Sequence, residues 1–318
     1  MISLFVADPA QGLNPGTDTT LYMLREALRR SWRCFWTTPQ DVYWRGGGVE
    51  ALAREVRSCA PQALADLKEP EILELNGGAD VVFVRQEPPV DADYISLCWL
   101  LAGYENRVRM INPASLLIRY HEKMLPMDGV AGGRLDADDI LPTCVSRETE
   151  RFIEFVKELE SDRIVIKPWL GYGGREIRRM DKKEFLNDPE GVLTGGGRWM
   201  IQPYDPEVEK TGDRRGFFFN GKYYGSVGRM PKPGGFIANF AQGGSAADQR
   251  LSQKEEVLIK KMERWLKTTG IVFAGSDFIG GRLSEVNITC PTGFAAYEKL
   301  YGENPARALF DDAFGHGA

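Results

Sequence analysis

The sequence predicts an α/β protein with some α+β elements, whose first part forms a parallel sheet covered by helices. Two observations lead to this fold class. Strand-like runs at Ile2–Ala7, Val81–Arg85 and 108–111 alternate with helix-like patterns across the first third of the chain. Later in the chain, antiparallel-looking strands surround a short turn. The composition is that of a folded globular protein, with 43% hydrophobic and 27% charged residues.

The N-terminal elements follow from local patterns. The apolar run Ile2–Ala7 predicts a first strand, which is followed by a loop rich in glycine and proline. Asp18 is expected to cap the next helix, because leucines recur at helical spacing beyond it. Val81–Arg85 and 108–111 supply the second and third strands. This alternation favours a small parallel sheet.

The middle of the chain changes character. Ser146 is expected to cap a helix that carries Phe152 and Val156 on one face. Residues 164–168 then predict a strand, which ends close to a glycine-rich loop. A strand followed by such a loop is a suitable place for binding an anion.

The last third reads as antiparallel strands and one amphipathic helix. Four strands are predicted there, at 216–219, 223–229, 272–279 and Arg282–Asn287. Asn220 and Gly221 form a dipeptide typical of the tight turn in a hairpin. Residues 252–255 read Ser-Gln-Lys-Glu, which is a capping box and predicts the start of the helix.

Composition excludes several classes of partner. Lys and Arg total 40 against 45 Asp and Glu, so the formal charge of -5 provides no cationic excess for nucleic acid. No apolar run approaches the ~18 residues that span a bilayer, and the N-terminus lacks the basic region of a signal peptide. The 5 cysteines are scattered singly, as in reduced proteins. We therefore expect a cytoplasmic protein without nucleic-acid or membrane partners.

The first feature that indicates chemistry is Lys167, which ends a predicted strand and is followed by Gly171, Gly173 and Gly174. Glycines let backbone N–H groups turn toward an anion, and a lysine adds a positive charge. The alternative is a tight turn that needs glycine only for its backbone. The spacing matches neither the P-loop nor the dinucleotide fingerprint.

The second feature is a set of oxygen-bearing side chains on two consecutive predicted strands. Strand alternation places Glu285 and Asn287 on one face, and a hairpin brings Asp277 opposite them. Two carboxylates and an amide oxygen suit a hard cation such as Mg²⁺. The alternative is a solvated sheet face, but Asp277 lies within an apolar run, where a buried carboxylate needs a partner.

Four cations near predicted element boundaries, Arg85, Lys123, Arg215 and Arg229, could neutralise a small anionic ligand. The alternative for each is an ordinary surface charge. The segment around 231–235 is rich in proline and glycine. It could close over a reaction as a lid or form a plain surface loop.

Residues 277–292, DFIGGRLSEVNITCPT, carry a specific resemblance to a known family. They are similar to the motif D-x-I-G-x-R-L-x-E-x-N-x-T-x-P-T, which closes the metal site of bacterial glutathione synthetases in the ATP-grasp superfamily. Shorter matches lie at 85–89, 112–113, 122–123, 166–168 and 212–215. The resemblance covers essentially the whole chain. It implies the ATP-grasp fold, with an N-terminal pre-ATP-grasp domain at 1–118, a central lid domain at 119–202 and a C-terminal catalytic domain at 203–318.

The resemblance also implies a role for individual residues. The ATP-binding residues would be Lys123, Lys167, Gly171, Gly173, Gly174, Gln202 and Tyr204. The ligands of Mg²⁺ would be Asp277, Glu285 and Asn287. The catalytic residues facing the reacting groups would be Arg215 and Arg229. The substrate pocket would contain Asp18, Thr20, Arg85 and Asn239.

The activity implied by the resemblance is that of an ATP-dependent carboxylate–amine ligase. Family members transfer a phosphoryl group from ATP to a carboxylate, which gives ADP and an acyl phosphate. An amine then attacks the acyl phosphate and releases phosphate. Such phosphoryl transfer needs positioning and charge neutralisation rather than a nucleophilic side chain. We expect γ-glutamylcysteine and glycine as the small-molecule substrates, ATP and Mg²⁺ as cofactors, and a homo-oligomer such as a tetramer. A ligase for a different peptide or amide bond, and a nucleotide-binding relative without activity, remain alternatives.

The chain departs from the family pattern at three places. Ile237 stands where the family usually carries an arginine, and Leu170 stands where its glycine-rich loop usually starts with aspartate. Residues 293–297 replace the family's usual sequence after the closing motif. An apolar side chain cannot replace the charge and planar donors of arginine, so these departures bear on which acid and amine the site accepts.

Overall fold

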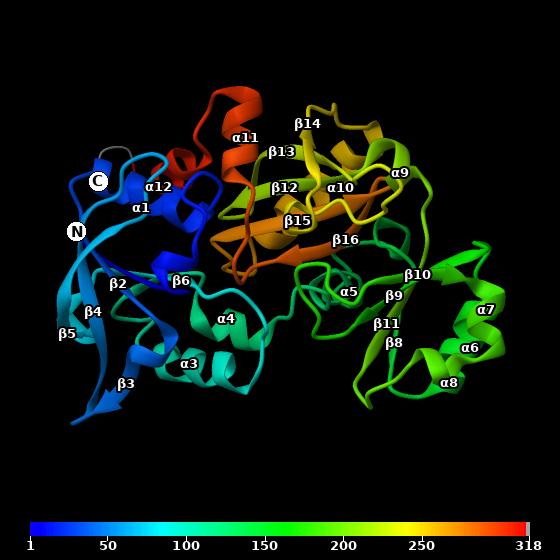
Figure 1. The fold of residues 1–318 in the computed structure, drawn as a ribbon, viewed down its shortest axis with the longest axis horizontal. Helices are drawn as coiled ribbons and strands as arrows, with labels where there is room; N and C mark the ends of the chain where they lie inside the picture. Colours follow the sequence, from blue (N-terminus) through cyan, green and yellow to red (C-terminus); the bar gives the residue numbers. More distant parts are fainter. Residues whose placement is uncertain (316–318) are drawn as a thin grey trace.

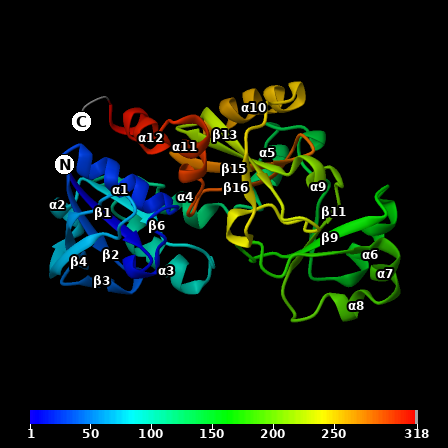
Figure 2. The ribbon, with the colours of Figure 1, turned by 45° about the horizontal axis from the view of Figure 1, so that its top comes forward.

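The computed structural model describes residues 1–315, which form three β-sheets with flanking helices (Figure 1). The N-terminal sheet, coloured blue to cyan, and the central sheet, coloured green, lie at opposite ends of the molecule. The C-terminal sheet, coloured yellow-green to orange, lies between them in both ribbon views (Figures 1 and 2). Among the described residues, no helix is both long enough and apolar enough to cross a bilayer.

The N-terminal sheet has the order β3-β4-β2-β1-β6-β7, with β5 paired to β4. Its strands are β1 (Ile2–Ala7), β2 (Arg33–Thr37), β3 (Val42–Arg45), β4 (Gly48–Ser58), β5 (Asp66–Glu74), β6 (Val81–Arg85) and β7 (Arg109–Ile111). The predicted parallel sheet is confirmed for β1, β6 and β7, and it also includes β2, which the sequence patterns did not predict. The other three strands pair antiparallel, which makes the sheet mixed. The patterns did not predict these three strands, of which β5 is mostly polar and exposed.

Helices cover both faces of the N-terminal sheet (Figure 1). They are α1 (Thr19–Arg29) and α12 (Pro305–Phe314) on one face, with α3 (Ala92–Ala102) and α4 (Ala114–Arg119) on the other; a short turn, α2 (Leu75–Gly78), precedes β6. The predicted cap of α1 is confirmed, since Asp18 Oδ1 accepts a hydrogen bond of 2.9 Å from the backbone N–H of Leu21. On the α12 side, Phe83 stacks between Phe5 and Phe310, with ring centroids 4.5 and 5.4 Å away.

The central sheet has the antiparallel order β10-β9-β11-β8. Its elements are β8 (Cys144–Ser146), α6 (Thr149–Glu158), β9 (Arg163–Pro168), β10 (Arg178–Asp181), α7 (Lys182–Asn187), α8 (Pro189–Val192) and β11 (Trp199–Pro203). In β9, Ile164 and Ile166 are buried against the helices, so Val165 and Lys167 project from the opposite face. The expectation that Ser146 caps α6 is wrong, because the N-cap of α6 is Glu148.

The C-terminal sheet is antiparallel, with the order β14-β13-β12-β15-β16. Its strands are β12 (Asp213–Phe219), β13 (Lys222–Met230), β14 (Ser245–Ala247), β15 (Phe273–Ile279) and β16 (Arg282–Asn287). The nearby helices are α5 (Leu125–Ala131), α9 (Glu207–Thr211), α10 (Gln253–Leu266) and α11 (Phe294–Tyr301). The capping box predicted for α10 is present: Ser252 Oγ accepts a hydrogen bond from Glu255 N, and the Glu255 carboxylate accepts one from Ser252 N. Short 3-10 turns lie at Ala10–Gly12, Pro39–Asp41, Ala137–Asp139 and Phe240–Gln242.

Residues alternate between the two faces of the C-terminal sheet, and each face packs against a different helix. Phe218 and Ala274 share a core with α10, whereas Phe217 and Phe273 share a core with α11. Arg215 and Asp277 lie two and four residues from Phe217 and Phe273 on the same strands, so they project from the α11 face. That face therefore carries polar side chains beyond the end of its apolar core.

Asn112 joins the N-terminal sheet to the C-terminal sheet. Its side chain is 3% exposed and makes four hydrogen bonds to the ends of β15 and β16. The amide nitrogen donates to Phe273 O at 2.7 Å and to Ile288 O at 2.6 Å. The amide oxygen accepts from Val272 N at 2.9 Å and from Phe273 N at 2.8 Å. All of its ordinary hydrogen-bonding capacity is therefore used between the two sheets. The domain boundaries after residues 118 and 202 stay predictions, and the second falls inside β11.

Candidate active site

A large cleft is lined by segments from all three sheets. Its volume is about 1370 Å³, and its walls include the loop after β1, strands β9 and β11, and the α11 face of the C-terminal sheet. Most of the residues predicted for the site line this cleft: Asp18, Lys123, Lys167, Gly171, Gly173, Gly174, Gln202, Tyr204, Arg215, Arg229, Asn239, Asp277, Glu285 and Asn287. A cleft of this size that gathers polar groups from separate segments is the expected location of a functional site.

Two of the predicted substrate-pocket residues, Thr20 and Arg85, are not among the residues that line the cleft. Both are buried, and Arg85 Nε donates to Thr20 Oγ1 at 3.1 Å. A second nitrogen of Arg85 donates to Pro291 O at 2.9 Å. Arg85 therefore supports the wall that contains residues after β16, whereas its role in a substrate pocket stays a prediction.

The centre of the cleft contains two arginines and two aspartates on adjacent strands. Arg215 forms two hydrogen bonds with Asp277, at 2.5 and 2.9 Å, and these residues are paired in the register of β12 and β15. Arg229 forms two more with Asp213, at 2.6 and 2.7 Å, and contacts Asp277 at 2.8 Å. The paired geometry holds both guanidinium groups in fixed orientations.

These four side chains are largely buried, which affects their ionisation. Burial by itself raises the pKa of a carboxyl group, but the guanidinium groups of Arg215 and Arg229 hold the pKa of Asp277 well below its usual range. Burial likewise opposes the charge on Arg229, yet Asp213 and Asp277 raise its pKa above the usual value. Burial raises the pKa of Asp213, although Arg229 acts in the opposite direction. The pKa shifts of Asp277 and Arg229 favour their charged forms, and fixed charges of this kind can stabilise a transferring anionic group.

Two lysines border this centre beside the glycine-rich loop. Lys123 is 4% exposed, and its Nζ donates to the carbonyl oxygens of Trp169, at 3.2 Å, and Gly171. Burial lowers the pKa of Lys167, although carboxylates such as Glu285 act in the opposite direction. Both ammonium groups face the cleft, where they would meet an anionic ligand.

The glycine-rich loop lies against the segment that follows β13. Gly174 has a φ of +75°, which favours glycine, and a Cβ there would lie 2.6 Å from Asn239 Nδ2, so the Asn239 side chain would have to move. Gln242 Nε2 donates to Gly173 O at 3.1 Å. The two loops are thus in direct contact across the cleft. The anion-binding role expected of the glycines stays a prediction, as does the alternative that they serve only a tight turn.

Tyr204 occupies the wall formed by the end of β11. Its hydroxyl accepts a hydrogen bond of 2.9 Å from Arg179 and donates to Glu209. Phe236 packs edge-on against the Tyr204 ring, with centroids 6.1 Å apart, and the Arg179 guanidinium lies 4.9 Å from the centroid of Phe236. Gln202, also from β11, is 2% exposed and donates to Thr143 Oγ1 at 2.9 Å.

Glu122 is a site residue that the sequence patterns did not single out. It is 6% exposed and lies beside Lys123, and it also lines the cleft. Burial and the nearby Glu285 carboxylate raise the pKa of Glu122 to about 8. Asp213 was likewise missed as a partner of Arg229, because only the cross-strand register brings the two together. The only sequence signal for either residue was its place in a short motif, at 122–123 and 212–215.

The predicted metal ligands have the correct chemistry for a hard cation. Asp277 is paired with Glu285 in the register of β15 and β16, and Asn287 lies two residues further along β16. Their oxygens suit Mg²⁺, which prefers carboxylates together with phosphate oxygens. Within residues 1–315, no group of three or more His, Cys, Asp and Glu side chains is arranged to hold a metal ion. A cation at this position would therefore need the amide oxygen of Asn287 and oxygens of a bound ligand in addition to the two carboxylates.

The end of the cleft nearest the N-terminal sheet is acidic. Asp8, Asp18 and Glu87 line it, and Tyr22 donates to Glu298 at 2.9 Å. Burial raises the pKa of Asp18, although its bond from Leu21 N and the charge of Arg85 act in the opposite direction. This end is suited to groups that donate hydrogen bonds, such as an ammonium.

Comparison with known proteins agrees with this geometry. Residues 1–117 match the family described as prokaryotic glutathione synthetase, N-terminal domain, and residues 136–302 match its ATP-grasp domain. A curated glutathione synthetase of Prochlorococcus marinus is 31% identical to the chain over 93% of the chain and 94% of the relative. One of Neisseria meningitidis serogroup A is 32% identical over 98% of the chain and 97% of the relative. The relative from Parasynechococcus marenigrum is 32% identical over 95% of each chain.

Solved structures with the same fold are more distant in sequence. A D-cycloserine synthetase aligns over 100% of both chains with a TM-score of 0.68 and 15% identity. The D-alanine-D-alanine ligase from Coxiella burnetii aligns over 98% of this chain and 93% of its own, with a TM-score of 0.58 and 12% identity. At such identities the likeness shows the fold alone. Together with the family matches, it establishes that this chain belongs to the prokaryotic glutathione synthetase family, whose members are ATP-dependent carboxylate–amine ligases of the ATP-grasp fold.

Proposed function

We propose that the protein joins γ-glutamylcysteine to glycine, using ATP and Mg²⁺, through an acyl phosphate on the cysteine carboxylate. The observation that carries this proposal is the ordered set of Arg215, Arg229 and Asp277 beside Lys123 and Lys167 in one cleft. Phosphoryl transfer is accelerated by fixed cations around the transferring group more than by a side-chain nucleophile. The site offers such cations.

The proposed ATP site lies between the central and C-terminal sheets. The ammonium groups of Lys123 and Lys167 would contact the phosphates, and the glycine-rich loop from Gly171 to Gly174 would leave room for them. The segment with Gln202 and Tyr204 would contact the adenine. The contacts of Lys123 with two loop carbonyls support this proposal, since they hold its ammonium at the edge of the loop.

Asp277, Glu285 and Asn287 would hold Mg²⁺, whose oxygen donors are completed by phosphate. When bound, Mg²⁺ supplies charge neutralisation at the phosphate oxygens. Arg215 and Arg229 would orient the reacting carboxylate and the phosphoryl group, because their aspartate partners fix both guanidinium planes. The segment after β13, which lines the cleft, would exclude water from the acyl phosphate.

A ligase for another acid and amine is the second candidate. It is favoured by Ile237, because this apolar side chain lies in the cleft wall beside Asn239 and offers no charge to a substrate carboxylate. The acidic end of the cleft, with Asp18 and Glu87, would then select an ammonium-bearing substrate of different shape.

Mass spectrometry of the products would test the proposal directly. The protein is incubated with ATP, Mg²⁺, γ-glutamylcysteine and glycine, and both glutathione and ADP are quantified. Glutathione with matching ADP supports the proposal. ATP binding without the tripeptide would contradict it in favour of the second candidate, for which other dipeptide-like acids and amines are then supplied.

We also propose a cytoplasmic location and a homo-oligomeric assembly, both from the family resemblance. Light scattering after size-exclusion chromatography measures the assembly, and a monomer at micromolar concentration would contradict it. Fractionation of cells that make the protein tests the location.

A further inference from the structure

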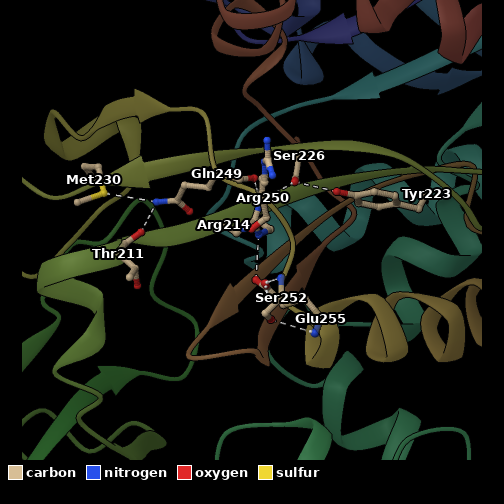
Figure 3. Close-up of polar contacts among 9 residues, drawn as sticks. All are labelled: Thr211, Arg214, Tyr223, Ser226, Met230, Gln249, Arg250, Ser252 and Glu255. Carbon is tan, nitrogen blue, oxygen red and sulfur yellow. Dashed lines mark hydrogen bonds and ion pairs between the residues drawn. The ribbon is translucent and has the colours of Figure 1, made fainter.

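Neighbouring arginines in β12 project from opposite faces of the C-terminal sheet. Arg215 faces the cleft, whereas Arg214 lies on the α10 face with the register partner Phe278. Figure 3 shows the Arg214 guanidinium on that face, between the two strands and the start of α10. Arg214 is 5% exposed and is not among the residues that line the cleft. It therefore cannot contact a substrate bound there.

The guanidinium of Arg214 uses all three of its nitrogens. Nε donates to Glu255 Oε1 at 2.9 Å, and Nη1 donates to Ser226 Oγ at 3.1 Å. Two further bonds, both of 2.8 Å, go to the backbone carbonyls of Gln249 and Arg250. These carbonyls belong to the stretch just after β14. Arg214 thus fastens that stretch to both the sheet and α10, with charge-assisted bonds in a buried setting.

The Gln249 side chain connects the same stretch to the end of β13 and to the residue before β12 (Figure 3). Its Nε2 donates to Thr211 O, just before β12, and contacts Met230 Sδ at 3.5 Å, at the end of β13. The side chain crosses Gly228 so closely that a Cβ there would lie 2.4 Å from Gln249 Cδ. The strand is therefore shaped to receive Gln249.

Between these two anchored ends lies the cap segment, residues 231–247, whose last three residues form β14 and pair with β13. Its residues that line the cleft are Phe236, Ile237, Ala238, Asn239, Phe240, Gly244, Ser245 and Ala246. Phe236 packs on Tyr204, and Gln242 bonds to the glycine-rich loop. The cap segment is thus one wall of the cleft, and both of its ends are held from outside the cleft.

We propose that Arg214 and Gln249 are positioning residues, which set the place of the cap segment over the cleft from the far side of the sheet. Because the cap segment leaves the sheet after Met230 and rejoins it through β14, which pairs with β13, the bonds of Arg214 and Gln249 hold the chain directly beside both ends and limit how far the wall can move. Loosened anchors would let water reach the acyl phosphate. This consequence rests on the proposed function, whereas the anchoring itself does not.

Two variants test the proposal, Arg214→Lys and Gln249→Ala. Lysine keeps the charge near Glu255 but cannot bond in several directions from one planar group. Gln249→Ala removes the side-chain contacts and leaves the backbone carbonyls, so it remains informative if Arg214→Lys does not fold. Arg30→Lys is the matched control, because the Arg30 side chain is 3% exposed and also bonds a buried glutamate, Glu26, but it lies at the end of α1, away from the cap segment.

Hydrogen exchange measured by mass spectrometry reports the anchoring without any substrate. We expect amides in 231–247 to exchange about threefold faster or more in both test variants, with α10 and the N-terminal sheet unchanged. The Arg30→Lys protein should exchange like the wild type in 231–247. Unchanged exchange in the cap segment would overturn the proposal, and so would an equal increase throughout the C-terminal sheet, because that pattern indicates a merely structural role.

The ratio of ADP to glutathione formed then measures the consequence for the reaction. The wild type and Arg30→Lys should give about one ADP per amide bond, and both test variants should give about two or more. A ratio that stays at one despite faster exchange would overturn the positioning role. If the wild type makes no glutathione, the proposed function fails, and the hydrogen-exchange result alone decides whether the cap segment is anchored as described.

Discussion

Replacing Asn112 with alanine should destabilise the whole molecule, because this side chain carries the polar connection between two sheets. The substitution removes four hydrogen bonds, to Val272 N, Phe273 N, Phe273 O and Ile288 O. Each is worth about 1 kcal/mol net, and buried backbone groups left without partners cost more, so the sum is about 4 kcal/mol. This is a large part of the ~5–15 kcal/mol by which a domain is typically stable.

Urea unfolding followed by circular dichroism measures this loss. We expect a lower midpoint for Asn112→Ala with the slope of the transition unchanged. Asn187→Ala is the control, since Asn187 is an exposed residue at the end of α7, and it should change the free energy of unfolding by less than about 0.5 kcal/mol. A loss below about 1 kcal/mol for Asn112→Ala would refute the reasoning, because water would then replace the amide at little cost.

The other predictions concern the cleft and its edge. Glu285→Gln should lower turnover by about 100-fold with an unchanged melting temperature, and full turnover would remove Glu285 from the metal site. Lys167→Ala should raise the apparent Kd for ATP about tenfold in calorimetry, whereas an unaltered Kd would indicate a structural lysine. Ile237→Arg should lower the KM for γ-glutamylcysteine, and an unchanged KM would show that this wall does not touch the dipeptide. Burial lowers the pKa of His121 from the ordinary value of 6.5 to about 4. Between pH 6.5 and about pH 4 the unfolded protein therefore binds a proton that the folded protein does not, and stability is lost as the pH falls through that range. His121→Gln should flatten the pH dependence of the unfolding free energy by about 3 kcal/mol, and an identical curve would contradict the burial effect.

Sequence patterns predicted the elements with strong local signals. β1, β6 and β16 have the predicted bounds, and the hairpin between β12 and β13 turns at Asn220 and Gly221 as expected. The pairing of Asp277 with Glu285 also followed from strand alternation and a short turn. In each case the determining information lies within a few neighbouring residues.

The remaining features depend on contacts between distant parts of the chain. β3 has only four residues, and β5 is half-exposed with many charged residues, so their periodicity is weak; both pair with β4. Arg85 is expected in the substrate pocket, and that role stays a prediction; its bonds to Thr20 and to Pro291 O could not be predicted from residue spacing. The short family match at 112–113 includes Asn112, but it gives no indication of the four hydrogen bonds that its side chain makes. Such roles depend on tertiary packing, which residue spacing does not encode.

The return of α12 to the first sheet has a consequence for synthesis of the chain. Phe310 packs on Phe83 and on Trp32, with centroids 5.4 and 5.2 Å away, so the last helix completes a core begun by the first strands. On the ribosome, β1 and β6 emerge well before α12, and this aromatic face lacks its α12 partner until that helix has been made. The N-terminal region therefore has to avoid aggregation as an incomplete layer during most of its production.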